Sequence, residues 1–132
     1  MKADANWFII FFMNFTQSIS HCFSNYTNFS GRASRTEFWW FFLFVMILEF
    51  AADIWDYITG YGESGFYIWI VIAATIVPSL SVGARRLHDL NKSGWLQLLA
   101  VTIIGLIPLF IWFATEGTKK NNSHGKPIKL KK

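Results

Sequence analysis

The chain holds a single cysteine, Cys22, so it can form no disulfide within itself and no metal site built from several cysteines. Charged side chains are also scarce: they make up 15% of the 132 residues, against about 25% in an ordinary soluble domain. Apolar residues reach 53%, and they include seven Trp and fourteen Phe. A soluble core of this size cannot hide so many large side chains, so the composition indicates a protein that lies in lipid.

The hydrophobic runs divide residues 1–132 into five segments of one domain. An N-terminal segment, residues 1–30, has helical spacing of its apolar side chains, which predicts a helix over 6–29 that lies in the membrane interface. Residues 34–58 and 66–90 are both long enough to cross a bilayer, which takes about 20 residues. A third apolar segment, 94–115, precedes a basic tail, 116–132. The expected fold class is an all-α membrane protein.

Local signals fix the start of the first long helix and a bend in the second. Ser34 and Glu37 have the spacing of a capping box, in which the hydroxyl takes the amide three residues on and the carboxylate reaches back. Pro78 lies inside the second apolar run, where it predicts a kink. The hydroxyls of Ser79 and Ser81, or a neighbouring helix, are candidates to satisfy the backbone there.

The third apolar segment, Trp95–Ala114, either crosses the membrane or forms a re-entrant hairpin. Cytoplasmic flanks are enriched in Lys and Arg, and the loop 56–65 has no cation. With that loop outside, a hairpin that returns near Gly105 keeps all twelve cations inside, whereas a single crossing places six tail lysines outside. However, twenty helical residues span about 30 Å, one full crossing. Charge favours the hairpin and length favours the crossing, so the sequence leaves both open.

A polar island, Arg85–Trp95, separates the last two apolar runs. Together with two arginines before the first long helix, its charges predict a cytoplasmic basic rim that binds anionic lipid headgroups or a partner protein. The rim residues are Arg32, Arg35, Arg85, Arg86, His88, Asp89 and Lys92. The alternative is a positively charged stop in which Asp89 pairs with an arginine to fix the turn.

The sequence gives little support to catalysis, metal binding or a cofactor. His88 and Asp89 are neighbours on a helix, where adjacent side chains do not face each other. His21, His88 and His124 have no partner at ligand spacing, so no metal site is expected. No catalytic residue and no cofactor is therefore predicted.

Glu49 is a second candidate site. It lies eleven residues after Phe38, roughly 16 Å along a helix and close to the middle of a bilayer about 30 Å thick. An ionisable group at that depth is a functional-site hypothesis by default. A shifted helix would instead place Glu49 near the outer face with Asp53 and Asp56, which follow it on one helical face.

Three motifs make the chain resemble the DUF805 family of small bacterial inner-membrane proteins. They are Gly31-Arg-Ala-Ser-Arg-Thr-Glu-Phe-Trp39, then Arg85-Arg-Leu-His-Asp89 with Ser93-Gly-Trp95, and the tail around Asn122–Gly125. The tail departs from the family pattern, because His124 stands where the family has Tyr. The resemblance implies a multi-pass protein of the bacterial inner membrane and assigns no biochemical activity.

The sequence therefore predicts a non-enzymatic structural or interaction protein, with anionic lipid, a protein partner or a second copy of the chain bound at its rim. The alternative is a small transporter or channel subunit that uses Glu49. The tail lysines predict a solvated, disordered segment attracted to anionic lipid. Nucleic acid is not an expected partner, because no aromatic side chains alternate with these lysines.

Overall fold

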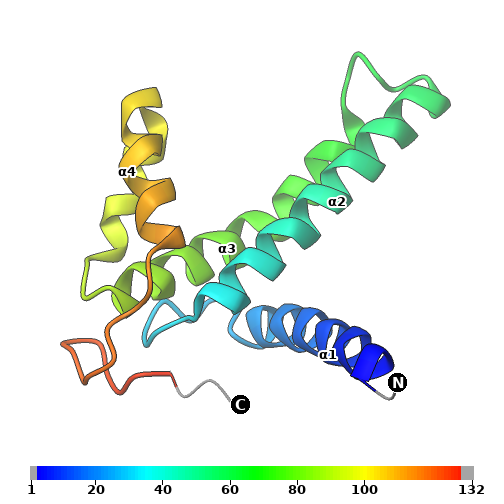
Figure 1. Ribbon diagram of the computed structural model, residues 1–132. Helices are drawn as coiled ribbons and strands as arrows, with labels where there is room; N and C mark the ends of the chain where they lie inside the picture. The colour runs from blue at the N-terminus through cyan, green and yellow to red at the C-terminus, as the bar shows by residue number, and fades with distance from the viewer. Residues whose placement is uncertain (1–2, 129–132) are drawn as a thin grey trace.

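The computed structural model describes the backbone of residues 3–128 and the side chains of residues 14–128. Four α-helices and one 3₁₀ helix account for most of this range: α1 (Ala3–Ser24), α2 (Arg35–Thr59), α3 (Phe66–Asp89), η1 (Gly94–Val101) and α4 (Ile103–Ala114). Figure 1 shows two arms that rise from one base: α2 and α3 lie side by side in the first, η1 and α4 form the second, and α1 lies across the base. The predicted all-α class is confirmed.

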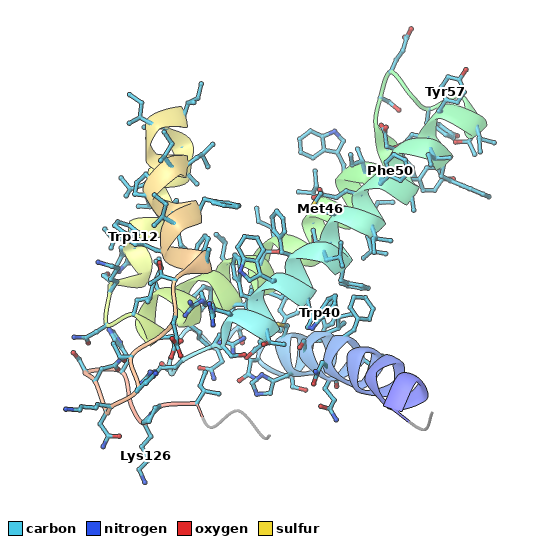
Figure 2. The ribbon with its side chains drawn as sticks, viewed as in Figure 1. Trp40, Met46, Phe50, Tyr57, Trp112 and Lys126 are labelled. Atoms are coloured by element: carbon cyan, nitrogen blue, oxygen red, sulfur yellow. The ribbon has the colours of Figure 1, made fainter. Side chains whose placement is uncertain are left out.

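The arm of α2 and α3 has the properties of a membrane-crossing hairpin. Both helices are long and apolar enough to cross a membrane, with mean hydropathy of 1.7 and 1.9. Only 17% and 28% of their apolar windows are buried, whereas a core helix of a soluble protein is mostly buried. Met46, Phe50 and other apolar side chains point away from the hairpin (Figure 2). Large apolar surfaces of this extent need an apolar surrounding.

Half of the predicted capping box forms at the start of α2. The Ser34 hydroxyl accepts a hydrogen bond from the Glu37 amide at 3.1 Å, as the spacing predicts. The Glu37 carboxylate does not reach back to Ser34; it turns inward and contacts Arg85 at 2.8 Å. A buried cation on α3 attracts the carboxylate more strongly than an amide at a helix end does.

The start of α3 has no side-chain cap of its own, and Asp56 of α2 supplies one. The two carboxylate oxygens of Asp56 accept hydrogen bonds from the amides of Tyr67 and Ile68, each at 3.0 Å. Asp56 is buried there, and its negative charge lies at the positive end of the α3 dipole. It therefore fixes the turn between the two helices, while Asp53 on the same helix is exposed.

Pro78 is buried inside α3, and a tyrosine satisfies the carbonyl that it frees. A proline has no N–H, so the carbonyl four residues earlier, that of Ala74, loses its helical partner. The Tyr26 hydroxyl donates to the Ala74 oxygen at 2.7 Å. Ser81, one of the two serines that the sequence offered for this role, donates instead to the carbonyls of Asn25 and Asn28.

The third apolar segment is a helical hairpin. Thr102 ends η1 and begins α4: its hydroxyl donates to the Leu99 oxygen at 2.9 Å and accepts from the Gly105 amide at 3.0 Å. The chain therefore reverses at Thr102, three residues before the expected position. Each half reaches about 16–18 Å, since η1 has 8 residues and α4 has 12.

Both ends of this hairpin lie beside the last turn of α3. Lys92 Nζ, just before η1, lies 4.6 Å from the centre of the Trp112 ring on the last turn of α4. Gly94 at the start of η1 packs so closely on α3 that an added Cβ would lie 2.8 Å from the Ala84 Cβ. The residues at the tip are highly exposed, Val101 at 85% and Ile103 at 84%.

The first helix ends earlier than expected. α1 stops at Ser24 instead of Phe29, because Asn25 to Asn28 form turns whose carbonyls receive the Ser81 hydroxyl of α3. The apolar run 7–13 keeps its helical backbone, but its side chains lie outside the described residues. Further along α1, Phe15 makes an edge contact with Trp40 of α2 at 5.6 Å between ring centres.

The bond from Tyr26 to α3 can be tested with a double-mutant cycle. We expect Tyr26→Phe to lower the free energy of unfolding by about 1 kcal/mol, because it leaves the Ala74 carbonyl without a partner. In a Pro78→Ala background the restored amide takes that carbonyl, so the same change should cost less, with a coupling energy on the order of 0.5–1 kcal/mol. Unfolding followed by tryptophan fluorescence in detergent would measure all four variants. Additive effects of the two substitutions would contradict the assignment.

Candidate functional site

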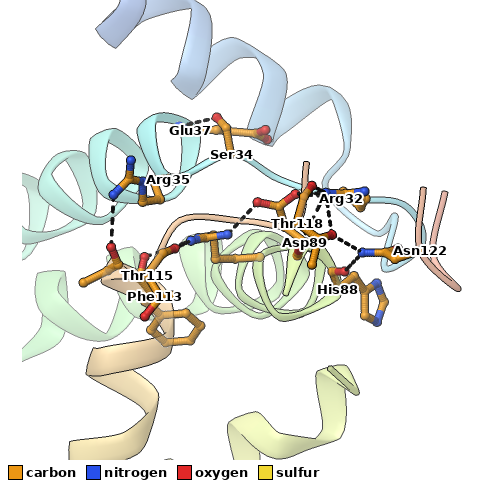
Figure 3. A network of polar contacts seen from close by, with 12 residues as sticks. Arg32, Ser34, Arg35, Glu37, His88, Asp89, Phe113, Thr115, Thr118 and Asn122 are labelled. Carbon is orange, nitrogen blue, oxygen red and sulfur yellow. Dashed lines mark hydrogen bonds and ion pairs between the residues drawn. The ribbon is translucent and has the colours of Figure 1, made fainter. Parts of the chain in front are cut away.

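Asp89, the last residue of α3, lies between two buried arginines. Its Oδ1 receives Arg32 Nη2 at 2.8 Å, and its Oδ2 receives Arg86 Nη1 at 2.7 Å (Figure 3). The side chains of Arg32 and Arg86 are 2% and 0% exposed. Both oxygens of the carboxylate are engaged, so the two buried arginines share its single negative charge.

A second carboxylate, Glu37, joins three elements. Its Oε1 lies 2.8 Å from Arg85 Nη1 of α3 and 2.8 Å from His21 Nδ1 of α1. Arg85 is 2% exposed, and two of its nitrogens, Nε and Nη2, have no hydrogen-bond partner among the described residues. We refer to Arg32, Glu37, Arg85, Arg86 and Asp89 as the ion-pair layer. It lies at the base, where α1, α2, α3 and the tail meet.

Cys22 lies beside this layer and is unreactive at neutral pH. Its thiol is buried and lies 3.5 Å from Glu37 Oε1, to which it donates. Burial, followed by the negative charge of Glu37, raises the pKa of the Cys22 thiol to about 12. The thiolate is the reactive form of cysteine, so the folded protein keeps Cys22 unreactive at neutral pH.

Two arginines also cap the C-terminal end of α4. Arg86 donates to the carbonyls of Thr115 and Phe113, the latter at 3.3 Å, and Arg35 donates to the Ala114 carbonyl at 3.3 Å. The last carbonyls of a helix have no partner within the helix and carry the negative end of its dipole. The last carbonyls of α4 have no partner within the helix, and these arginines donate to them. The hydrogen bonds therefore hold the second arm against the first.

The tail folds back over the ion-pair layer. Arg32 donates to the carbonyl of Thr118, to the Lys120 carbonyl at 3.0 Å and to the Gly125 carbonyl at 3.3 Å. Gly117 passes so close to Asp89 that an added Cβ would lie 1.8 Å from its Oδ2. The expectation of a disordered tail is therefore wrong up to Ile128, because one buried guanidinium has donors for several carbonyls. The last three lysines lie outside the described residues.

Near the tail turn, His124 stacks on His88. The two rings are parallel, with centres 3.9 Å apart, and His88 Nδ1 lies 3.0 Å from the Gly31 carbonyl. Asn122 donates to the His88 carbonyl at 2.9 Å and completes this contact. His88 therefore faces the tail and not Asp89. No group of three or more His, Cys, Asp or Glu side chains in the described part of the chain could hold a metal ion.

The predicted rim is thus divided between buried and exposed residues. The structure brings together Arg32, Arg85, Arg86 and Asp89, but it buries them in internal pairs. Arg35 is exposed, and Lys92 is half-buried under its contact with Trp112. The arrangement that the sequence offered as the alternative, in which Asp89 pairs with an arginine, is present in the structure.

The other predicted site residue, Glu49, lies apart from this layer. It is half-buried on α2, fourteen residues after Arg35, which corresponds to roughly 21 Å along the helix. Neither of the hollows described next includes it.

Two hollows open beside the ion-pair layer and share Arg35 and Thr36. The polar hollow has a volume of about 460 Å³; besides those two residues it is lined by Arg32, Ser34, Asp89, Glu116, Gly117, Thr118, Lys119, Pro127 and Ile128. The aromatic hollow has about 680 Å³, and its other lining residues among the described side chains are Asn14, Trp39, Trp40, Leu43 and Ala114. The two hollows therefore share one arginine, and tryptophans line only the second of them.

Sequence reasoning misses several residues of this site. The spacing of Ser34 and Glu37 predicts only a role in the helix cap for Glu37. An acidic residue close to several cations in the sequence also indicates an ion pair. Cys22 and His21 give no signal, because they lie on a helix whose packing the sequence does not specify. Thr118 and Asn122 belong to a segment that its lysines predict to be solvated. The resemblance to a family motif marks Asn122, and nothing in the sequence marks Thr118.

The comparisons with known proteins place the chain in one family. A family model described as "Protein of unknown function (DUF805)" matches residues 26–126. The chain is similar to the inner membrane protein YhaI of Escherichia coli K12, with 39% identity over 107 residues, which is 80% of this chain and 90% of the relative. It is also similar to the inner membrane protein YhaH of the same organism, with 34% identity over 110 residues, 80% and 91% of the two chains. No solved structure matches it at a significant level.

Removing the charge of Asp89 should destabilise the whole base. Asp89→Asn leaves Arg32 and Arg86 buried without a compensating charge, so we expect the free energy of unfolding to fall by about 3–5 kcal/mol. The matched control is Asp53→Asn on the exposed face of α2, which should change it by about 0.5 kcal/mol or less. Thermal unfolding in detergent compares the two. Equal melting of both variants would show that the ion-pair layer is not what holds the base together.

Proposed function

The chain belongs to the DUF805 family, and we propose that it is an inner-membrane protein whose cytoplasmic face binds anionic lipid without catalysing a reaction. The relatives named as inner membrane proteins support the location. One observation carries the rest: both ends of the third apolar segment lie at the base, together with all the cations of the described residues.

In this proposal α2 and α3 cross the membrane and the hairpin of η1 and α4 enters it without crossing. The two long helices have 25 and 24 residues, about 37 and 36 Å, which is enough for a hydrocarbon core of about 30 Å. The hairpin reaches about half as far and is apolar on its exposed surface. α1 lies across the base (Figure 1), as an interfacial helix does.

The distribution of charge supports a cytoplasmic base. The loop between α2 and α3 has no cation, whereas the base holds the arginines and the described lysines of the tail, Lys119, Lys120 and Lys126. Lysine and arginine are enriched on the cytoplasmic side. Figure 2 shows Lys126 at the base and Tyr57 near the opposite end of the first arm. Because the hairpin of η1 and α4 enters and leaves on one side, the tail returns to the side of Arg35.

The exposed cations, and not the buried arginines, are the groups that face lipid. Lys119, Lys120, Lys126 and Arg35 are exposed, and each basic side chain near an anionic surface contributes about 1 kcal/mol to binding. The buried carboxylates serve ion pairs, and the His88 ring stacks on another ring, so these groups support packing instead of a reaction.

The side of the tail can be tested with single cysteines. Asn121→Cys, on the exposed tail, should react with a membrane-impermeant thiol reagent only after the cells are lysed. Glu63→Cys, in the loop between α2 and α3, should react in intact cells. Cys22 can stay in place, because its raised pKa and burial keep it silent. Labelling of the tail in intact cells would divide the cations between two faces and remove the basis of this proposal.

The lipid preference can be tested by changing the tail charges alone. We expect a triple variant with Lys119→Gln, Lys120→Gln and Lys126→Gln to copurify with less phosphatidylglycerol, because it loses three cations near the surface. The same three positions changed to arginine keep the charge and should retain the lipid. Lipid is measured by mass spectrometry after extraction from the purified protein. An unchanged lipid content in the glutamine variant would refute the lipid-binding face.

A further inference from the structure

Resting on the proposed function, we propose that the polar and the aromatic hollow together hold one anionic phospholipid, with its phosphate at Arg35 and an acyl chain along Trp39, Trp40 and Leu43. The two hollows share Arg35 and Thr36, so the sites for the two ends of such a molecule are continuous. The hollows have volumes of about 460 and 680 Å³ and both are open depressions, which suits a ligand that lies partly in the surrounding bilayer.

The polar hollow offers Arg35 to an anion. The charges of Arg32 and Asp89 on its wall are already paired with each other, and Lys119 Nζ lies 3.7 Å from a Glu116 oxygen. Arg35 has no acidic partner among the described residues; its bond to the Ala114 carbonyl at 3.3 Å uses one of five donors. A guanidinium with free donors matches the oxygens of a phosphate group.

The start of α2 adds to this attraction. Arg35 and Thr36 are the first two residues of the helix, and Ser34 caps the amide of Glu37. The amides of the first turn have no partner within the helix, and the helix dipole places partial positive charge there. An anion beside Arg35 therefore faces a formal charge and a dipole of the same sign.

The aromatic hollow suits an acyl chain. Trp39, Trp40 and Leu43 come from two successive turns of α2, and Leu43 is 39% exposed. The Trp39 indole N–H already donates to the Phe113 carbonyl at 3.2 Å, so the wall offers its ring surface. Tryptophan side chains favour the level where headgroups meet hydrocarbon. An anion without a hydrocarbon part would leave this hollow unused, which is why a phospholipid fits better than free phosphate.

The experiment measures binding of phosphatidylglycerol to the delipidated full chain in a non-ionic detergent, by native mass spectrometry. We expect one molecule per chain. Arg35→Gln should weaken its binding about five-fold, whereas Arg35→Lys should restore most of it. The matched control is Lys92→Gln, which removes a half-buried cation of the base outside both hollows and should change the affinity less than two-fold (about 0.4 kcal/mol). Equal effects of Arg35→Gln and Lys92→Gln would overturn the headgroup site.

A second experiment tests the acyl-chain site by comparing lipids with long and short acyl chains. Leu43→Asn should weaken binding of the long-chain lipid and leave the short-chain dihexanoyl form unchanged. Ile47→Asn, one turn further along α2 and outside the hollow, is the matched control. Equal effects of these two variants, or equal competition by glycerol 3-phosphate alone, would overturn the acyl site and leave an anion site only. If the wild-type protein does not prefer phosphatidylglycerol to phosphatidylcholine, the proposed function fails as well. If the wild-type protein has this preference and Arg35→Gln retains it, only the site proposed here fails.

Discussion

The rest of the structure depends on the contact of Asp89 with Arg32 and Arg86. Three segments far apart in sequence meet there: the loop before α2, the last turn of α3 and the tail. Buried charges are costly, and their mutual attraction compensates only when geometry is good and the remaining donors are satisfied. Here the donors that Asp89 does not take go to backbone carbonyls of the tail and of α4. Arg32 thereby joins the tail to the base, and Arg86 joins α4 to α3.

The need for donors to several backbone carbonyls explains why arginines join these segments. α4 ends close to the base, and its last carbonyls need donors because they have no partner within the helix. Arg86, Arg35 and the Trp39 indole provide them from α3 and α2. Lysine has a compact ammonium that cannot reach several carbonyls and a carboxylate in one plane. The same rule applies to Ala74, whose carbonyl receives the Tyr26 hydroxyl.

Local chemistry is predictable from the sequence, and long-range pairing is not. Ser34 as a helix cap and the two long apolar helices follow from spacing and hydropathy, and both are confirmed. The charge rule favours a hairpin in the third apolar segment, which the structure contains. The pair of Asp89 with Arg86, three residues away on α3, is local. The pairs of Glu37 with Arg85 and of Asp89 with Arg32 join residues 48 and 57 positions apart, and no local pattern specifies them. The described lysines of the tail are exposed, as their charge predicts. The expectation of disorder is wrong because Arg32 binds the backbone carbonyls of the tail.

The position of the tail has a consequence for the order of assembly. Carbonyls between residues 113 and 125 receive donors from Arg32 and Arg86, which precede them in the chain. Synthesis proceeds from the N-terminus, so α2 and α3 are complete while these donors still lack their final acceptors. The ion-pair layer can therefore reach its final arrangement only after residues 113–125 have joined the base.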